Sequence, residues 1–173
     1  MNTKDFKKIV LPMSEKLYNF ARLLLHDDAE AEDAVQEVFI KLWNKRKDMK
    51  TINNIEAFSM RMTKNWCLDR IKAKKPMYVD DYSKGFDNQV SVAVPDKILE
   101  NSDKVNLVYE VMSRLPEQQR MIIQLRDIEG YEYKEIAEVL EINETAIRVN
   151  LSRARNKIRE TLTKTESYGC QGN

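Results

Sequence analysis

The chain has 173 residues, of which 42% are hydrophobic and 33% charged, and its formal net charge is +1. This hydrophobic share is enough for a packed core and excludes wholesale disorder, while only four glycines and four prolines argue against a turn-rich all-β chain. No apolar run reaches the roughly 20 residues of a membrane-spanning helix, and no secretory signal pattern opens the chain, so we expect a cytoplasmic protein.

The first part of the sequence predicts two helices. One helical pattern runs from about Phe6 to Leu25, and a second begins after Asp27 and Asp28, which are good N-cap residues. Apolar residues of the second helix recur at helical spacing and predict its buried face. They are Ala31, Ala34, Val35, Val38, Phe39 and Leu42. The residues that face away from this stripe include Asp33, Gln36, Glu37 and Ile40.

A third helix is predicted between Asn53-Asn54 and Pro76. Its apolar stripe would be Ile55, Phe58, Met62 and Trp66. Asn65, Asp69 and Lys72 share another face and could contact unstacked bases, with cations beside them. Two plainer interpretations remain open at this point: Trp66 as a core residue, and the lysines as a solvated helix end.

Residues 76–95 lose helical periodicity and predict a linker, after which helical patterns resume near Pro95 and continue to Lys164. We therefore expect an all-α chain of two small helical domains, 1–75 and 96–164, joined by a flexible acidic linker, with residues 165–173 as a fraying tail. Cys67 and Cys170 lie far apart in the sequence. We expect both to be free thiols, because the cytosol is reducing, although a disulfide between them remains an alternative. Together with His26 they cannot fill a zinc site, and no metal or cofactor is expected.

The most informative segment is YEYKEIAEVLEINETAIRVNLSRARNKIRETL. A helix near 133–140, a three-residue turn, and an N-cap at Asn143 before a basic helix are typical of a DNA-binding helix-turn-helix. Glu141 stands in the turn, and a left-handed backbone there costs on the order of 1 kcal/mol. An ordinary helical hairpin is the plainer alternative. The residues facing away from the core are Glu144, Thr145, Arg148, Val149, Ser152, Arg153 and Arg155.

Charge is segregated along the chain although the total is nearly neutral. Six acidic residues and no lysine or arginine lie in Asp27–Glu37, whereas six basic residues and one aspartate lie in Arg61–Lys75. An acidic stretch over 80–103 precedes a second basic block over 148–164. Two basic blocks on either side of an acidic connector predict two contacts with a polyanion, while solvated helix faces are the plainer interpretation.

Both halves, in this order, resemble a bacterial RNA polymerase sigma factor of the extracytoplasmic-function (ECF) class. The matching segments are AEDAVQEVFIKLW with EAFSMRMTKNWCLDRIKAKK, and LPEQQRMIIQLRDIEGYEYKEIAEVLEINETAIRVNLSRARNKIRETL. The departures are Glu141 where glycine is commoner and Asn150 where a basic residue is frequent. The resemblance implies a subunit that directs core RNA polymerase to promoters and helps to open them. It also implies an anti-sigma factor as a regulator, in this class often attached to the inner membrane.

The resemblance further implies roles for particular residues. Asp33, Gln36, Glu37 and Ile40 would meet the polymerase clamp. The loop around Lys50 to Glu56 would help to shape a pocket for a flipped minus-ten base. The minus-ten DNA surface would comprise Asn65, Trp66, Asp69, Arg70, Lys72, Lys74 and Lys75. Arg148, Val149, Ser152 and Arg153 would read the minus-thirty-five element, with Glu144, Thr145 and Arg155 beside them.

Two other classes of protein remain as alternatives. A self-contained helix-turn-helix regulator would bind as a dimer, but the sequence has no evident dimerisation helix. A helical adaptor that binds only proteins would leave the basic helix unexplained. An enzyme is the least favoured class, because no Ser/His/Asp set, phosphate-binding glycine loop or metal cluster is visible, and no small-molecule substrate is expected.

Overall fold

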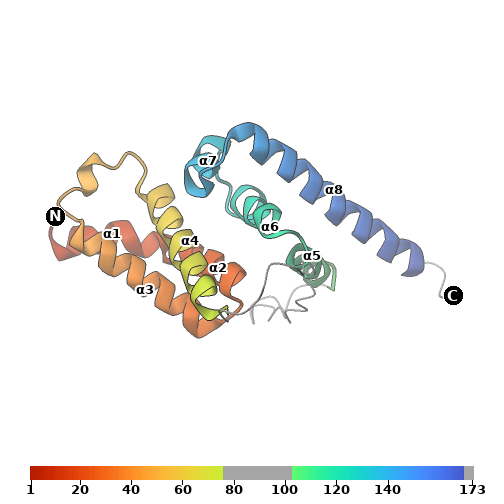
Figure 1. The fold of residues 1–173 in the computed structure, drawn as a ribbon, viewed down its shortest axis with the longest axis horizontal. Helices are drawn as coiled ribbons and strands as arrows, with labels where there is room; N and C mark the ends of the chain where they lie inside the picture. Colours follow the sequence, from red (N-terminus) through yellow and green to blue (C-terminus); the bar gives the residue numbers. More distant parts are fainter. Residues whose placement is uncertain (76–102, 170–173) are drawn as a thin grey trace. The chain divides into compact units, whose positions relative to one another are not determined.

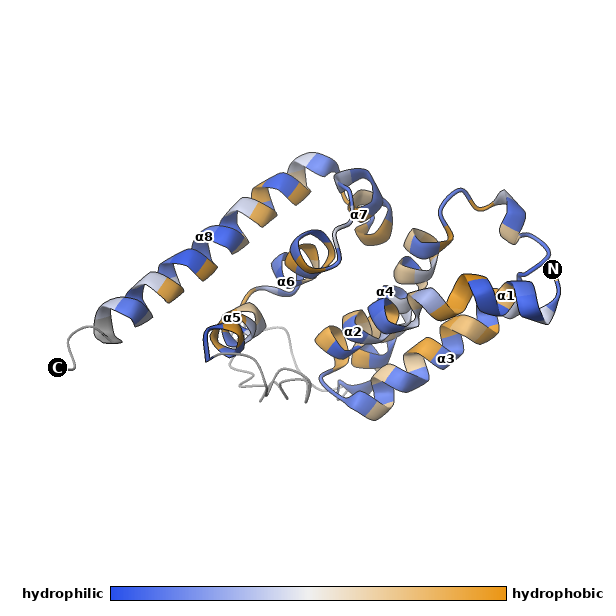
Figure 2. Ribbon diagram, turned by 180° about the vertical axis from the view of Figure 1, so that it is seen from behind, coloured by the Kyte–Doolittle hydropathy of each residue, from blue (hydrophilic) through white to orange (hydrophobic). Residues whose placement is uncertain are grey.

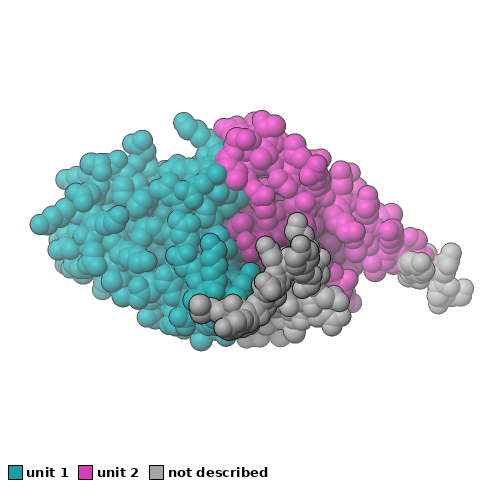
Figure 3. Space-filling model, viewed as in Figure 1, with its two compact units in different colours: residues 1–89, 134–141 teal, residues 90–133, 142–173 magenta. Residues whose placement is uncertain are grey.

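The computed structural model describes residues 1–75 and 103–169, and within these ranges it is helical with no strand (Figure 1). The prediction of an all-α chain with two helical domains is therefore confirmed. The predicted linker 76–95 lies outside the described residues. The chain divides into two compact units, which are Met1–Gln89 with Lys134–Glu141, and Val90–Tyr133 with Ile142–Asn173 (Figure 3).

The single helix expected over Phe6–Leu25 is wrong in one respect. The structure has α1 (Thr3–Val10), a 3₁₀ turn η1 (Leu11–Met13) and α2 (Ser14–Leu25). Pro12 explains the interruption, because its nitrogen has no hydrogen to donate to a helical carbonyl. The helix α1 begins at a side-chain cap, in which the backbone N–H of Asp5 donates to Asn2 Oδ1 at 2.9 Å.

Helices α2, α3 (Asp28–Asn44) and α4 (Ile55–Lys74) pack against one another and form the core of the first unit. The predicted cap at Asp27 is confirmed, since its side chain accepts from the N–H of Glu30 at 2.9 Å. Asn54 caps α4 in the same way, by accepting from the N–H of Ala57 at 2.9 Å. A short 3₁₀ turn, η2 (Met49–Thr51), lies between α3 and α4 and is anchored by the buried Met49. The predicted buried face of α3 is also confirmed, with Val35 and Phe39 half-buried at its edges.

The buried face of α4 differs from the predicted one. Ile55, Phe58, Met62 and Trp66 are only half-buried, and the fully buried residues lie on another side of the helix. These are Ala57, Ser59, Met60, Thr63 and Cys67. Four of these five side chains are small, and this side of α4 packs against α2 and α3. The two hydroxyls donate to carbonyls four residues earlier, which satisfies them inside the core.

Cys67 is a free thiol on this buried face, and its side chain is fully shielded from solvent. Burial raises the pKa of Cys67 from 9.0 to about 12, because the thiolate would lose its hydration. The folded state therefore holds the proton more tightly than the unfolded state. Stability is unaffected below the unfolded pKa, and this group lowers the free energy of unfolding as the pH rises from about 9 towards 12.

We therefore expect Cys67 to resist alkylation in the native protein at pH 8. In a Cys170→Ser variant, iodoacetamide should modify Cys67 only after denaturation, as mass spectrometry of the intact chain would report. Rapid modification in native buffer would contradict the packing of α4 described above.

In the second unit, α8 (Glu144–Gly169) packs against α5 (Asp103–Ser113) and α6 (Glu117–Ile123). Figure 2 shows hydrophobic and hydrophilic residues alternating along α8, as expected of an amphipathic helix. The predicted break at Leu115-Pro116 is present, with Pro116 at the N-cap of α6. The predicted tail boundary after Lys164 falls inside α8, which continues to Gly169.

After α6 the chain forms a π-helical turn, η4 (Gln124–Ile128), which leads to a turn at Gly130 with φ of 78° and then to α7 (Tyr133–Leu140). Glu141 adopts φ of 58°, so the left-handed backbone considered from the sequence is present, and its cost is on the order of 1 kcal/mol. Asn143 caps α8, since its Oδ1 accepts from the N–H of Ala146 at 2.8 Å. Two helices joined by a three-residue turn are therefore in place.

Candidate functional site

The exposed face of α3 brings together the four residues predicted to contact a protein partner. Asp33, Gln36 and Glu37 are exposed, and Ile40 is 53% exposed although it is a large hydrophobic residue. Their spacing of i, i+3, i+4 and i+7 places them along one side of the helix. An exposed isoleucine that follows carboxylates in this way offers an apolar anchor with an acidic surround, which suits a basic protein surface.

A groove between α2 and α3 adjoins this face and was not predicted from the sequence. Its lining includes Tyr18 and Glu15 from α2 and Gln36 and Glu32 from α3. Burial, together with the charge and hydrogen bond of Asp28, raises the pKa of Tyr18 above its ordinary value. The groove therefore extends the acidic character of the α3 face onto α2. The only signal for it in the sequence was the acidic run itself.

The solvent side of α4 carries the residues predicted to contact melted DNA. Asn65, Asp69, Arg70, Lys72 and Lys75 are exposed, as such a contact requires. Trp66 is half-buried, so it is neither a fully buried core residue nor a fully open stacking platform. The guanidinium carbon of Arg70 lies 5.9 Å from the centroid of its ring. A partly open aromatic ring beside a cation can still accept a stacked base.

Lys74 is used differently from its neighbours, because its ammonium pairs with the carboxylate of Glu30 on α3. This pair joins the end of α4 to the start of α3 within the first unit. Lys74 is therefore less available to DNA than Lys72 and Lys75, for which the structure gives no intramolecular ion pair among the described residues.

Phe58 is a further candidate on α4 that sequence reasoning assigned to the core. It is half-buried, and two cations approach its ring, Lys45 at 5.9 Å and Arg61 at 5.5 Å from the centroid. Phe58 lies seven residues before Asn65 and therefore on the same side of the helix. The periodicity of Phe58, Met62 and Trp66 was visible in the sequence, but it was interpreted as a core stripe.

The exposed face of α8 carries the predicted groove-reading residues. Arg148, Ser152 and Arg153 are exposed, and Val149 is 43% exposed. The opposite face is buried through Ile147, Leu151 and Ala154. Glu144 is half-buried and Thr145 is exposed at the N-terminal turn of the helix. Two cations, a hydroxyl and an apolar side chain are a set that can contact guanine, phosphate and a thymine methyl in a major groove.

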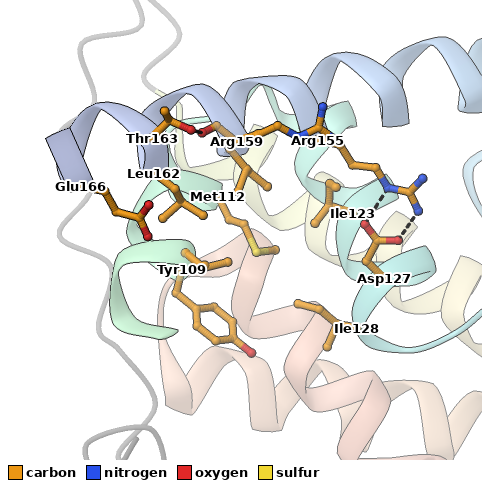
Figure 4. A pocket seen from close by; sticks show the side chains of 12 residues that line it. Tyr109, Met112, Ile123, Asp127, Ile128, Arg155, Arg159, Leu162, Thr163 and Glu166 are labelled. Carbon is orange, nitrogen blue, oxygen red and sulfur yellow. Dashed lines mark hydrogen bonds and ion pairs between the residues drawn. The ribbon is translucent and has the colours of Figure 1, made fainter. Parts of the chain in front are cut away.

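Arg155 lies two turns beyond Arg148 on α8 and has an intramolecular partner. Its guanidinium donates to both carboxylate oxygens of Asp127, at 3.0 and 2.5 Å, and this hydrogen bonding raises its pKa above the ordinary value. Figure 4 shows this pair at a pocket of about 440 Å³ beside α5 and α8, which is also lined by Met112, Ile123 and Leu162. The pair fixes α8 to η4, so Arg155 contributes to the fold of the second unit.

The side chain of Asn150 donates to the carbonyl of Ala146 at 2.9 Å, within its own helix. This is the position at which the sequence departs from the frequent basic residue. Among the described residues, no group of three or more His, Cys, Asp or Glu side chains is arranged to hold a metal ion. Within residues 1–75 and 103–169, no helix combines the length and apolar character needed to cross a membrane.

Two family models match the chain, and they match different parts of it. Residues 10–76 match sigma-70 region 2, and residues 106–158 match sigma-70 region 4. The first match contains α2, α3 and α4, and the second contains most of α5, then α6, η4, α7 and the N-terminal half of α8. Both proposed DNA surfaces and the α3 face therefore fall inside the matched ranges.

Relatives of similar length match nearly the whole chain. The ECF RNA polymerase sigma factor SigW of Bacillus subtilis is 28% identical over 165 residues, which cover 91% of this chain and 88% of SigW. The RNA polymerase sigma-H factor of Pseudomonas aeruginosa is 26% identical over 169 residues, covering 92% of this chain and 86% of that protein.

Solved structures share the fold. The sigma factor RpoE of Bartonella quintana, solved in complex with the anti-sigma factor NepR, superposes with a TM-score of 0.66 at 22% identity, covering 93% of this chain and 98% of RpoE. CnrH, solved in complex with the cytosolic domain of CnrY, gives a TM-score of 0.68 at 21% identity, covering 94% of this chain and 90% of CnrH.

Proposed function

Because the chain belongs to the ECF sigma factors of bacterial RNA polymerase, we propose that it binds the core enzyme through the exposed face of α3, directs it to promoters through α4 and α8, and helps to open them. The observation that supports these three roles is that three distinct surfaces lie on three different helices. The acidic face with Ile40 lies on α3, the basic surface with Asn65 on α4, and the Arg148–Arg153 face on α8.

The α8 face suits duplex DNA. An arginine held bidentately on guanine contributes about 1–3 kcal/mol of discrimination between bases. Arg148 and Arg153 lie five residues apart, on one exposed side, with Val149 and Ser152 between them. A helix presented in this way, after a three-residue turn, can place its N-terminal half in a major groove and read the minus-thirty-five element.

The α4 surface suits unpaired bases instead. Unstacking a base costs a few kcal/mol, and a stacked base regains about 1–3 kcal/mol on an aromatic ring. The exposed amide of Asn65 can pair with a base edge, while Phe58 and Trp66 supply partly open rings on the same helix. Arg70, Lys72 and Lys75 would neutralise backbone phosphates. Trapping the bases in this way offsets the cost of melting the minus-ten element.

The core polymerase supplies the catalysis, and this chain supplies recognition. The proposed place of action is the cytoplasm, where the polymerase is found. An anti-sigma factor is the proposed regulator, in line with the complex of RpoE with NepR, and the α3 face and its groove are surfaces that such a partner could occlude. Covering Ile40 would block the polymerase contact without touching either DNA surface.

The free protein is expected to bind DNA weakly. Each unit offers only a small DNA surface, and two tethered sites gain effective concentration only when their spacing matches the DNA. We expect dissociation constants in the non-specific range of about 10⁻⁴–10⁻⁶ M at physiological salt, and much tighter binding once core polymerase is added. Fluorescence anisotropy with labelled promoter fragments would measure both. Tight, sequence-specific binding by the free protein would instead support an autonomous regulator.

A further inference from the structure

The ring of Tyr133, the first residue of α7, lies close to two arginine side chains. The guanidinium carbon of Arg126, on η4, is 4.6 Å from the ring centroid, and that of Arg148, on α8, is 4.7 Å away. Distances below about 6 Å are typical of cation–π contacts. Tyr133 is half-buried, and it is not among the residues that the sequence predicted to contact DNA.

Arg148 is also held by a second contact. Its Nη2 donates to the carboxylate of Glu144, one turn earlier on α8, at 3.3 Å. A free arginine side chain loses rotamer entropy when it is fixed. Contacts with a ring and a carboxylate restrict the side chain before DNA binds, so part of that entropy is already lost. The guanidinium has five N–H donors, so the contact with the ring and one hydrogen bond to Glu144 leave other donors available for a base edge.

Arg126 is fixed in turn and supports the ring. Its Nη1 donates to the carbonyl oxygen of Tyr131 at 2.7 Å, and it pairs with Glu132 at 3.5 Å. The π-helical turn η4 places Arg126 on the chain just before the Gly130 turn. The ring of Tyr133 therefore contacts two cations: Arg126, which is held by its own hydrogen bonds, and Arg148, which is expected to read DNA.

We propose that Tyr133 is a positioning residue, whose ring holds the guanidinium of Arg148 in the orientation in which it reads one base pair of the minus-thirty-five element. This inference rests on the proposed function of α8. On this proposal, Tyr133 influences which base is preferred at the one base pair that Arg148 contacts. It has no influence on the preference at the other positions.

The test compares Tyr133→Leu with Tyr133→Phe, using reconstituted polymerase and promoters in which each base pair of the minus-thirty-five element is varied. Tyr133→Leu is expected to lower transcription about two- to fivefold at promoters with the preferred base at the Arg148 position, and to flatten the preference only there. Tyr133→Phe keeps the ring and should retain the preference. In an Arg148→Ala background, Tyr133→Leu should have no further effect. Tyr109→Leu, a matched change on α5 of the same unit, should leave the preference unchanged.

A second measurement needs no polymerase. The Nε–H relaxation of Arg148 by NMR should report an ordered side chain in the parent protein and in Tyr133→Phe, and a mobile one in Tyr133→Leu. An equal loss at every promoter position, or a loss that persists with Arg148→Ala, would overturn the positioning role. So would an ordered Arg148 in Tyr133→Leu. If the parent protein fails to direct transcription, the proposed function fails, while the relaxation experiment still decides whether Tyr133 orders Arg148.

Discussion

Ile40→Glu is expected to weaken binding to core RNA polymerase by about 30-fold or more. Ile40 is the only large hydrophobic residue on the proposed docking face of α3, and buried anchors of this kind contribute 2 kcal/mol or more to an interface. The substitution removes the anchor and adds a charge that would be desolvated on docking. Because Ile40 is already 53% exposed, the fold should be unaffected. Competition with a labelled sigma factor for core polymerase would give the change in affinity.

Leu11→Glu provides the matched control. Leu11 lies on η1 and is 58% exposed, so the same kind of change is made at an equally open aliphatic residue outside the α3 face. Near-normal polymerase binding is expected for this variant. Equal losses in the two variants would point to a general effect of added charge, and unchanged binding by Ile40→Glu would remove α3 from the docking surface.

Reversing the charge of both Arg148 and Arg153 is expected to abolish promoter use while polymerase binding is retained. Each arginine is expected to contribute about 1–3 kcal/mol, and a glutamate in its place would repel the DNA. We therefore expect Arg148→Glu with Arg153→Glu to reduce transcription by at least about 100-fold. Both side chains are exposed, so the core of the second unit, built around Ile147 and Leu151, should remain intact.

Lys104→Glu with Lys164→Glu makes the same change in net charge in the same unit. Both lysines are exposed and lie away from the Arg148–Arg153 face along the sequence. This control should retain most of its transcription, measured alongside polymerase pull-down. Normal transcription by the double arginine variant would contradict the proposed role of α8 and favour an adaptor that binds only proteins. Loss of its polymerase binding would instead place these arginines in a protein interface.

The sequence predicted features that depend on neighbouring residues. Asp27 and Asn143 are N-caps as expected, since an N-cap depends on a side chain and a backbone N–H three residues apart. The exposed faces of α3 and α8 followed from helical periodicity, because their opposite faces carry uninterrupted apolar residues. The break at Leu115-Pro116 followed from the geometry of proline.

Features that depend on packing could not be predicted in the same way. Helix α4 has two candidate apolar faces, and periodicity alone favoured the one with the larger side chains. The structure instead buries the side with Ala57, Met60 and Cys67 against α2 and α3. Pairings between distant residues, such as Arg155 with Asp127 or Lys74 with Glu30, have no signature in the sequence.

The approach of Arg148 to Tyr133 illustrates the same limit at the site. The two residues are fifteen positions apart and lie on different helices, so only the turn between α7 and α8 determines that their side chains meet. The sequence indicated that Arg148 faces away from the core. It gave no indication that an aromatic ring holds the guanidinium.

Run-off transcription with purified core polymerase and a library of genomic fragments tests the central claim most directly. With the protein present, sequencing of transcript 5′ ends should reveal a set of start sites that share two elements at a fixed spacing, and these starts should be absent with core polymerase alone. A protein that remains folded and helical but adds no specific start sites, and does not co-purify with the polymerase, would contradict the assignment of this chain as a promoter-directing subunit.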